Sequence, residues 1–313
     1  DDIGNRISSG SGTSSLAPNT TSPFTDLEMT DYTPNDLNQY DEVEHPRTIH
    51  VTGFSPAGQT VTVNGATATR QSHAFDGVVT ATGTDPVWQQ VTVESSKTSP
   101  PTTATSTGFR YVPPEEEALA YDEDGNLTQD GRWDYEWDGE NRLRRMTTTS
   151  AAATAGIPNL KLEFQYDGYS RRIQKKRYKF EGSTWDLQSD TRFIYHGWNL
   201  IAEIEMDGSA TDAPATQTTP GPFLRRSYLW GEDLGGSVGG ELDPSRAGAG
   251  GVGGLLAVTR HDRGVREAET FWATWDLNGN VTGLRSSSTT RSSVYEYDAF
   301  GNSIRVNESE ESL

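Results

Sequence analysis

The chain of 313 residues contains no cysteine, and this absence excludes several kinds of structure and chemistry. Without thiols the protein has no disulfides, no thiolate zinc site and no cysteine nucleophile. The sequence also has no apolar run of membrane-spanning length, so we predict no membrane insertion. No segment carries a long helical repeat of apolar residues, so long helices are not expected.

Hydrophobic residues are scarce, but aromatic residues are not. Only 32% of the residues are hydrophobic, and the mean hydropathy of −0.69 is low for one compact globule. Aromatic residues make up 10% of the chain, which is too many for a disordered protein. Aromatic side chains on alternating strand positions can hold a sheet together without a thick aliphatic core. The composition therefore favours a thin-walled β architecture.

Acidic residues outnumber basic ones, and the net charge is −19. Nucleic-acid binding needs a basic face, so we expect no nucleic-acid partner. One basic run stands out at 171–177, Arg-Arg-Ile-Gln-Lys-Lys-Arg. We interpret it as the solvated face of a strand, and a patch for phosphate or an acidic partner is the alternative.

The stretch at 121–127, Tyr-Asp-Glu-Asp-Gly-Asn-Leu, is typical of a β-hairpin. Asp122 suits the first position of a type I turn, and Gly125 suits the left-handed conformation that follows such a turn. Tyr121 would then face Leu127 across the two strands as an aromatic–aliphatic pair.

This unit recurs along the chain at loose intervals. The copy at 137–143 has Asn141, which also tolerates the left-handed conformation, in the glycine position. Because the intervals vary, we predict a strip of hairpins rather than a strict solenoid. The residues that we predict to hold structural positions of the repeat are Tyr121, Asp122, Gly125, Asn126, Trp137, Asp138, Tyr166, Asp167, Trp275, Asp276, Gly279, Asn280, Tyr297, Asp298, Gly301 and Asn302.

These repeated Tyr-Asp and Trp-Asp units resemble those of the YD-repeat (Rhs-type) proteins of bacteria. The glycine-rich stretch 248–256, which follows Trp230-Gly231, adds to the resemblance. It is clearest over 113–313 and extends in part to 1–44. The resemblance implies a long β-strip wound into a hollow shell around a toxic C-terminal region. It also implies a secreted or cell-envelope location, with the rest of the parent chain (Rhs core and effector) as partner.

The family's autoproteolytic core site is marked by Asp-Pro-x-Gly motifs. The two Asp-Pro pairs of this chain begin at Asp85 and Asp243, and neither has glycine two places after the proline. The site is therefore not carried over, and the chain resembles a fragment upstream of the Rhs core.

We predict three parts: a partial YD-repeat segment with a flexible linker at 1–44, an inserted Ig-like or glucodextranase-like β-sandwich at 45–112, and the YD-repeat β-strip at 113–313. Short alternating strands, separated by Gly, Pro and Asn-Gly, support the sandwich. Within this scheme we expect a flexible loop at 8–22, a Pro/Thr/Ser linker at 98–108 and a short helical turn near 113–120.

No residue set indicates catalysis, a cofactor or a metal. The Asp-x-Asp-Gly turns lack the glycine and glutamate positions of an EF-hand, and turn chemistry explains their residues. The glycine-rich loop at 235–254 lacks the Gly-Lys-Ser/Thr of a phosphate loop, and its Gly-x-Ser-x-Gly match around Ser237 is not followed by a helical pattern. We therefore predict a non-enzymatic protein.

The function predicted from the sequence is that of a shell segment that helps to encapsulate a C-terminal effector. The alternative is a cell-surface adhesion or glycan-binding protein, in which Trp133, Trp137, Trp198 or Trp230 would stack on sugars. A hydrolase is the third possibility.

Overall fold

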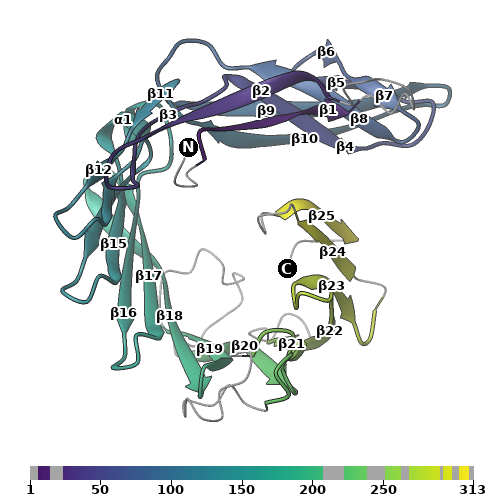
Figure 1. The fold of residues 1–313 in the computed structure, drawn as a ribbon. Coiled ribbons are helices and arrows are strands. Elements are labelled where there is room, and N and C mark those ends of the chain that lie inside the picture. The colour runs from purple at the N-terminus through teal and green to yellow at the C-terminus, as the bar shows by residue number, and fades with distance from the viewer. Residues whose placement is uncertain are drawn as a thin grey trace. The chain divides into compact units, whose positions relative to one another are not determined.

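The computed structural model describes residues 6–14, 24–206, 222–237, 251–261, 268–289, 292–297 and 303–309. Within these ranges the regular structure is almost entirely antiparallel β (Figure 1), which confirms the predicted all-β class. The single helix described, α1 (Ser150–Thr154), begins after Thr149, whose side chain accepts a hydrogen bond from the Ala152 N–H at 3.2 Å. The chain divides into two compact units, 1–161 and 162–313.

The first unit contains a small sheet that joins distant parts of the sequence. Its strand order is β1 (Ser8–Ser14), β2 (Phe24–Pro34), β3 (Tyr40–Glu44) and β11 (Glu116–Ala118). Glu117 of β11 faces Val43 of β3, and its carboxylate lies 2.6 Å from Nε2 of His45. The pairing of β3 with β11 brings together the two ends of the segment between them, as expected for an inserted module. The predicted domain boundaries themselves stay predictions.

The segment between β3 and β11 forms two facing sheets. One has the order β4 (Thr48–Phe54), β8 (Ala74–Thr80), β7 (Thr69–Gln71), and the other β10 (Pro101–Val112), β9 (Val87–Thr98), β5 (Thr60–Val63), β6 (Ala66–Thr67). Alternate residues of these strands point between the sheets and form one buried core. Its members are Ile49, Val61, Val63, Ala68, Phe75, Val79, Ala81 and Val112.

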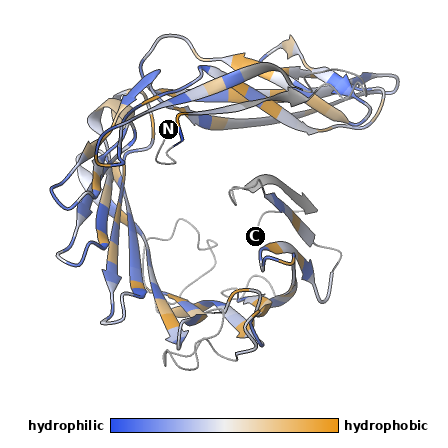
Figure 2. Cartoon of the chain, in the orientation of Figure 1, coloured by the Kyte–Doolittle hydropathy of each residue, from blue (hydrophilic) through white to orange (hydrophobic). Residues whose placement is uncertain are grey.

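From β12 on, the order of the strands in the sheet is the order in which they occur in the chain, as predicted for a strip of hairpins. The strands in the first unit are β12 (Ala120–Tyr121), β13 (Leu127–Gln129), β14 (Trp133–Trp137) and β15 (Leu143–Thr148), and β16 (Leu160–Tyr166) lies at the boundary. The second unit continues with β17 (Arg172–Glu181), β18 (Thr184–His196), β19 (Asn199–Glu205), β20 (Phe223–Trp230), β21 (Leu255–Arg260), β22 (Glu269–Trp275), β23 (Val281–Ser286), β24 (Ser292–Tyr297) and β25 (Ser303–Ser309). Figure 2 shows hydrophobic and hydrophilic residues interspersed along the strands that it colours.

A β-bulge accompanies the aromatic residue of the repeat in six hairpins. Thr274 faces Gly283 while Trp275 faces Val281, so Thr282 has no partner in the ladder. The register shifts immediately before the aromatic residue in the same way at Tyr121, Trp137, Tyr195, Trp230 and Tyr297. A bulge bends its strand and increases the local twist. One bulge per hairpin is therefore a regular source of curvature in the strip.

Three local predictions were wrong. The expected linker at 98–108 is largely strand β10, because its threonines favour β structure and pair with β9 over twelve positions. The expected helical turn at 113–120 contains β11 and the start of β12, since pairing with β3 overrides the helical preference of the glutamates. Ser8–Ser14, predicted as part of a loop, pairs with β2. Tertiary pairing outweighed local composition in each case.

Gly279 provides a test of the hairpin geometry. It has φ +83°, and an added Cβ would lie 2.6 Å from Cγ1 of Val252. Gly182 has φ +66° but no atom within 4 Å of such a Cβ. We expect Gly182→Ala to lower the free energy of unfolding by about 1–2 kcal/mol through left-handed strain alone, and Gly279→Ala to lower it further. Urea denaturation of both variants measures this, and equal losses would contradict the close packing around Gly279.

Candidate functional site

The turn of each well-formed repeat is organised by one aspartate. Oδ1 of Asp122 accepts hydrogen bonds from the N–H groups of Asp124 (3.1 Å) and Asn126 (2.8 Å). Its Oδ2 accepts a third from the side-chain amide of Asn126 at 3.0 Å. The same two main-chain bonds and one side-chain bond recur at Asp138, Asp167, Asp233 and Asp276. The aspartate of the repeat therefore fixes the path of the turn by itself.

The third residue after each of these aspartates has a positive φ. Gly125 (+85°), Gly279 (+83°) and Asn141 (+57°) confirm the predicted left-handed positions. Ser170 (+60°) and Gly236 (+74°) hold the same place in their turns. A glycine in this position avoids a strain that Asn and Ser must tolerate.

The fourth residue after the aspartate supplies the side-chain donor, and here the sequence was only partly informative. Asn126 and Asn280 were recognised as repeat positions, and both bond to their aspartates. Arg142, Arg171 and Ser237 fill the same role but were not recognised. The signal was a fixed distance of four residues from the aspartate rather than a fixed residue type.

The turn at Asp233 was missed as a repeat, because its residues fall in the glycine-rich stretch. Three hydrogen bonds tie its carboxylate to Gly235 and Ser237, and a fourth comes from the Gly251 N–H at 3.1 Å. These donors, above all the Ser237 N–H, lower the pKa of Asp233 to about 2. The hydroxyl of Ser237, the serine of the Gly-x-Ser-x-Gly match, thus donates a hydrogen bond that stabilises the turn.

In four repeats the aromatic residue donates a hydrogen bond to the main chain of the preceding hairpin. Val281 faces Trp275 across their hairpin, and its carbonyl accepts a hydrogen bond from the hydroxyl of Tyr297 at 2.7 Å. Leu255 faces Trp230, and its carbonyl accepts from Nε1 of Trp275 at 2.8 Å. The same relation joins Trp137 to Leu127 (2.7 Å), opposite Tyr121, and Trp230 to Leu200 (2.7 Å), opposite Tyr195.

These bonds, which we call the aromatic braces, connect consecutive hairpins beyond the β ladder. The predicted pairing of Tyr121 with Leu127 is confirmed. The sequence did not predict that the Leu127 carbonyl also accepts a hydrogen bond from Trp137. Among the other predicted positions, Asp138 and Asp167 organise turns and Tyr166 ends β16. Asp298, Gly301 and Asn302 lie outside the described residues.

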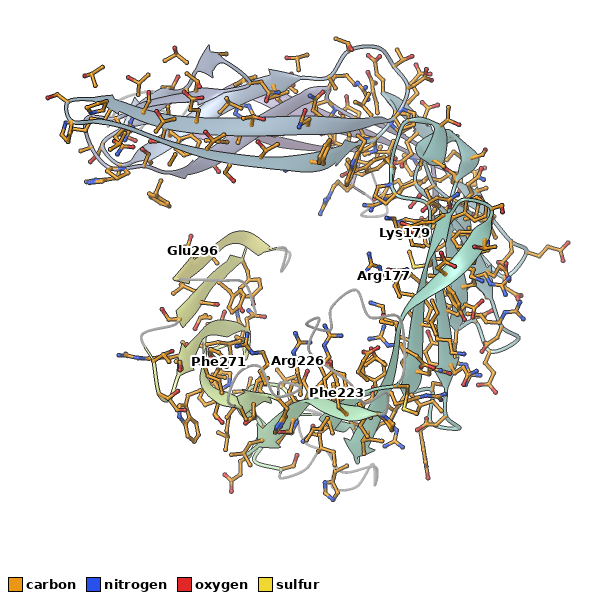
Figure 3. The ribbon with its side chains drawn as sticks, turned by 180° about the vertical axis from the view of Figure 1, so that it is seen from behind. Arg177, Lys179, Phe223, Arg226, Phe271 and Glu296 are labelled. Atoms are coloured by element: carbon orange, nitrogen blue, oxygen red, sulfur yellow. The ribbon has the colours of Figure 1, made fainter. Side chains whose placement is uncertain are left out.

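The sheet of the second unit has two chemically different faces. Directly paired residues lie on the same face, and one such row runs Phe193, Glu203, Arg226, Arg260, Glu269 across five strands. Figure 3 shows the labelled Arg177, Lys179, Phe223, Arg226 and Phe271 on the side toward which this unit's strip curves, and Glu296 on the opposite side. We call these the inner and outer faces.

Charged groups of the inner face largely neutralise one another. Glu203 accepts a hydrogen bond from Tyr228 at 2.5 Å and lies 3.3 Å from Arg226. Burial, together with the Glu203 carboxylate, raises the pKa of Tyr228. Arg260 lies 3.6 Å from Glu269, which also accepts from the hydroxyl of Ser286 at 2.6 Å. The face is therefore polar but close to balanced in this region.

Exposed apolar side chains lie mainly on the outer face. Phe271 of the inner face is 3% exposed, whereas Trp272 beside it in β22 is 51% exposed. Curvature crowds side chains on the inner side and separates them on the outer side. By register, the large outer-face residues that remain exposed are Phe180, Ile194, Leu224, Leu229, Trp272 and Val294.

Part of the basic run interrupts the balance of the inner face. Lys175 and Arg177 have no ion pair within the described ranges, whereas Lys176 lies 4.0 Å from Asp190. Burial, followed by Arg172 and Arg177, lowers the pKa of Lys175. The run is a strand with cations on both faces, and no phosphate cradle is formed from it.

Other chemistries find little support in the described residues. They contain no group of three His, Cys, Asp or Glu residues that could hold a metal ion, and no helix long and apolar enough to cross a membrane. Ser227 Oγ lies 2.8 Å from Nε2 of His261, but within the part of the chain described here no carboxylate bonds to that histidine. Trp137 and Trp230, considered for glycan stacking, use their indole N–H in the braces, while Trp198 is 46% exposed.

Comparisons with known proteins give matches over part of the chain. It is 24% identical over 198 residues to the tRNA3(Ser)-specific nuclease WapA of Bacillus spizizenii, and 23% identical over 198 residues to the tRNA nuclease WapA of Bacillus subtilis. These residues are 63% of this chain and 6% of each relative, so the chain spans a small part of the curated proteins it matches. No family model matches the chain.

Two solved structures match most of this chain with low scores. The crystal structure of TcdB2-TccC3-TEV matches with a TM-score of 0.35 and 11% identity, covering 98% of this chain and 13% of that one. The Tc holotoxin pore of Photorhabdus luminescens matches with a TM-score of 0.25 and 8% identity, covering 93% and 22%. Both TM-scores are too low for geometry to be carried over. The sequence matches relate 198 residues of the chain to part of the two WapA proteins.

Acid should weaken the turn at Asp233 in a defined range. Its pKa is lower in the folded chain (about 2) than the ordinary value of about 3.9, so its stabilisation is complete above pH ~4 and is lost as the pH falls toward 2. We expect Asp233→Asn to reduce the slope of unfolding free energy against pH in this range. Thermal melts at several pH values measure the slope. Asp124→Asn is the control, since the Asp124 carboxylate accepts no hydrogen bond from described residues, and identical slopes in the two variants would contradict the assignment.

The aromatic braces can be tested by removing one donor. Trp230→Phe keeps an aromatic ring but loses the hydrogen bond to Leu200, which we expect to cost about 1 kcal/mol of unfolding free energy. Trp198→Phe, at an exposed position without such a bond, should change it by less than about 0.5 kcal/mol. Equal losses in urea denaturation would show that the brace adds nothing to stability.

Proposed function

We propose that the chain is a structural, non-catalytic segment of a toxin-associated YD-repeat shell that helps to encapsulate a C-terminal effector. The observation that carries the proposal is the inner face of the second unit. Phe193 and Phe271 are buried there, Glu203 and Glu269 are paired with arginines, and the exposed apolar side chains lie mainly on the other face. A wall of this kind exposes few apolar groups to which an enclosed polypeptide could bind.

The partner proposed for this face is the rest of the parent chain, including its Rhs core and effector. The matched relatives are named nucleases, and the matched residues are 6% of their length, so we assign no nuclease activity to this segment. A secreted or cell-envelope location belongs to the same proposal. Nucleic-acid binding and membrane insertion do not, because the net charge is −19 and no long apolar run is present.

Protease protection in the full-length parent protein tests encapsulation. We expect the effector region to resist a protease concentration that degrades the isolated effector. Gly279→Val, which strains one hairpin of the wall, should increase effector cleavage severalfold, whereas Trp272→Phe on the outer face should not. Cleavage of the effector at the same rate inside and outside the parent protein would contradict encapsulation.

Surface adhesion is the second candidate, supported by the exposed rings of Trp198, Trp272 and Trp275. Exposed aromatic rings can stack on sugars as they stack on other flat or apolar ligands. A glycan array distinguishes the two functions. Selective binding that Trp272→Ala abolishes would favour adhesion, and an array without binding would favour the shell.

A further inference from the structure

Strand β10 of the sandwich has an edge without the usual protection. It pairs with β9 from Pro101 to Val112 without any register shift, and among the described strands it pairs with no other. Residues 102–109 contain neither a charged residue nor a proline. Exposed edges are normally blunted by charges, prolines or bulges, because an open edge invites another strand. This edge lacks all three over eight positions.

The orientation of the main chain on this edge follows from the opposite side of β9. The N–H of Thr92 donates to Oδ1 of Asn64 at 2.7 Å, and its carbonyl accepts from the N–H of Asn64 at 2.8 Å. Both main-chain groups of Thr92 therefore point away from β10, so its pair with Thr107 is a non-hydrogen-bonded one. By alternation, the N–H and C=O groups of Thr103, Thr105, Thr107 and Phe109 point toward the free edge.

An open groove of about 360 Å³ lies beside this edge. Ile49 and Val51 of β4 line one side, and Val91 and Val93 of β9 form apolar lining on the other. Strand β4 is itself the end strand of its sheet, so the groove lies where the sandwich is open between two edge strands. The apolar lining is only partly covered, since Val51, Val91 and Val93 are half-buried.

Small residues of β10 leave this groove empty. Ser106 and Gly108 face the same side as Val93 and Val91, and a Cβ on Gly108 would have no atom within 4 Å. Arg110 follows on the same side and has no ion pair within the described residues. His50 also lines the groove, but its Nδ1 lies 3.1 Å from both carboxylate oxygens of Asp76. The groove therefore combines apolar walls with one uncompensated cation at its end.

We propose that this groove binds an extended polypeptide strand that pairs with β10. The main-chain groups of Thr105 and Thr107 would bond the strand, small aliphatic side chains would fill the space beside Gly108, and an acidic residue would face Arg110. Alternate unpaired N–H and C=O groups select a peptide main chain, which is how β-strand addition gives affinity. A second copy of β10 fits less well, since its groove-side residues near the centre (Ala104, Ser106 and Gly108) are too small to cover the valines. This proposal is independent of encapsulation.

The test uses the whole 313-residue chain and a defined probe. An acetylated, fluorescein-labelled heptapeptide, Glu-Thr-Val-Thr-Val-Thr-Ser, would place glutamate opposite Arg110 and both valines in the groove when it runs antiparallel to β10. Fluorescence anisotropy measures its binding. In this register the threonine N–H groups bond to β10 and the valine N–H groups point away. N-methylation of the threonines should therefore weaken binding at least about tenfold, and N-methylation of the valines should not.

Three variants of the chain test the same site from the protein side. Thr105→Pro removes an N–H that faces the free edge and leaves the β9 ladder intact, while Thr105→Val keeps that N–H. Gly108→Val adds a side chain to the groove at a position where a Cβ has no atom within 4 Å. We expect Thr105→Pro and Gly108→Val each to weaken peptide binding at least about tenfold. Thr105→Val should bind the peptide like the parent chain. Gly108→Val should have the same melting temperature as the parent chain.

Several results would overturn the proposal. These are no saturable binding of the heptapeptide, equal binding of the two N-methylated forms, or equal binding by Thr105→Pro and Thr105→Val. The edge would instead be assigned to a second copy if light scattering shows a dimer, Thr105→Pro makes the chain monomeric, and the peptide does not bind. Binding of oligosaccharides that displaces the peptide would assign the groove to a glycan.

Discussion

The hydrogen bond from a repeat aromatic to the neighbouring hairpin is the interaction on which the strip depends. A sheet built from hairpins alone is held together by its ladder, and a low content of aliphatic residues gives that ladder little hydrophobic support. The indole or phenol group of the aromatic residue adds a bond beyond the ladder. It donates to the main-chain carbonyl of the residue that faces the previous repeat's aromatic, as Trp275 does to Leu255. The hydrogen bond thus joins each such hairpin to the one before it at the same repeat position. The aromatic ring covers apolar area while its polar tip forms the bond, so one residue does both.

The brace requires that the aromatic arrive at the correct position, and the aspartate turn and the bulge ensure that it does. The carboxylate of Asp276 holds the turn closed, Gly279 takes the left-handed conformation, and the ladder then skips Thr282. The skipped residue shifts the register immediately before Trp275. On the partner strand, the residues before and after Thr282 therefore do not follow the regular alternation between the two faces of the sheet. Because the skip recurs in six hairpins, its bending accumulates along the strip. The curvature of the second unit and the separation of its faces have the same local origin.

This dependence explains which parts of the structure the sequence revealed. Turn chemistry acts within five residues, so Gly125, Asn141 and the pair Tyr121–Leu127 could be predicted from their neighbours alone. The faces could not, because each bulge exchanges the roles of odd and even positions and the sequence does not mark the skipped residue. The chain contains Leu, Val or Ile after the turn at varying places, and Ile304 proves to be the skipped residue, with Ser303 facing Tyr297. Strand β10 was misjudged for a different reason: its Thr/Ser composition is common to linkers and to exposed strands, and only the pairing with β9 decides between them.

The two faces of the second unit have a consequence for how such a wall can work. A face that encloses a polypeptide must neither bind it through apolar patches nor repel it with uncompensated charge. The row Glu203, Arg226, Arg260, Glu269 meets the second condition because its two negative and two positive charges sum to zero, and burial of Phe193 and Phe271 meets the first. Lys175 and Arg177 are the exception, because their charges face the same side and neither has an ion pair with a residue that the structure describes. In a chain of net charge −19, two free cations on the inner face are a local attraction for acidic segments of whatever that face meets, and ionic strength would weaken it. Contacts made by a few screened charges are broken more readily than contacts between large apolar surfaces.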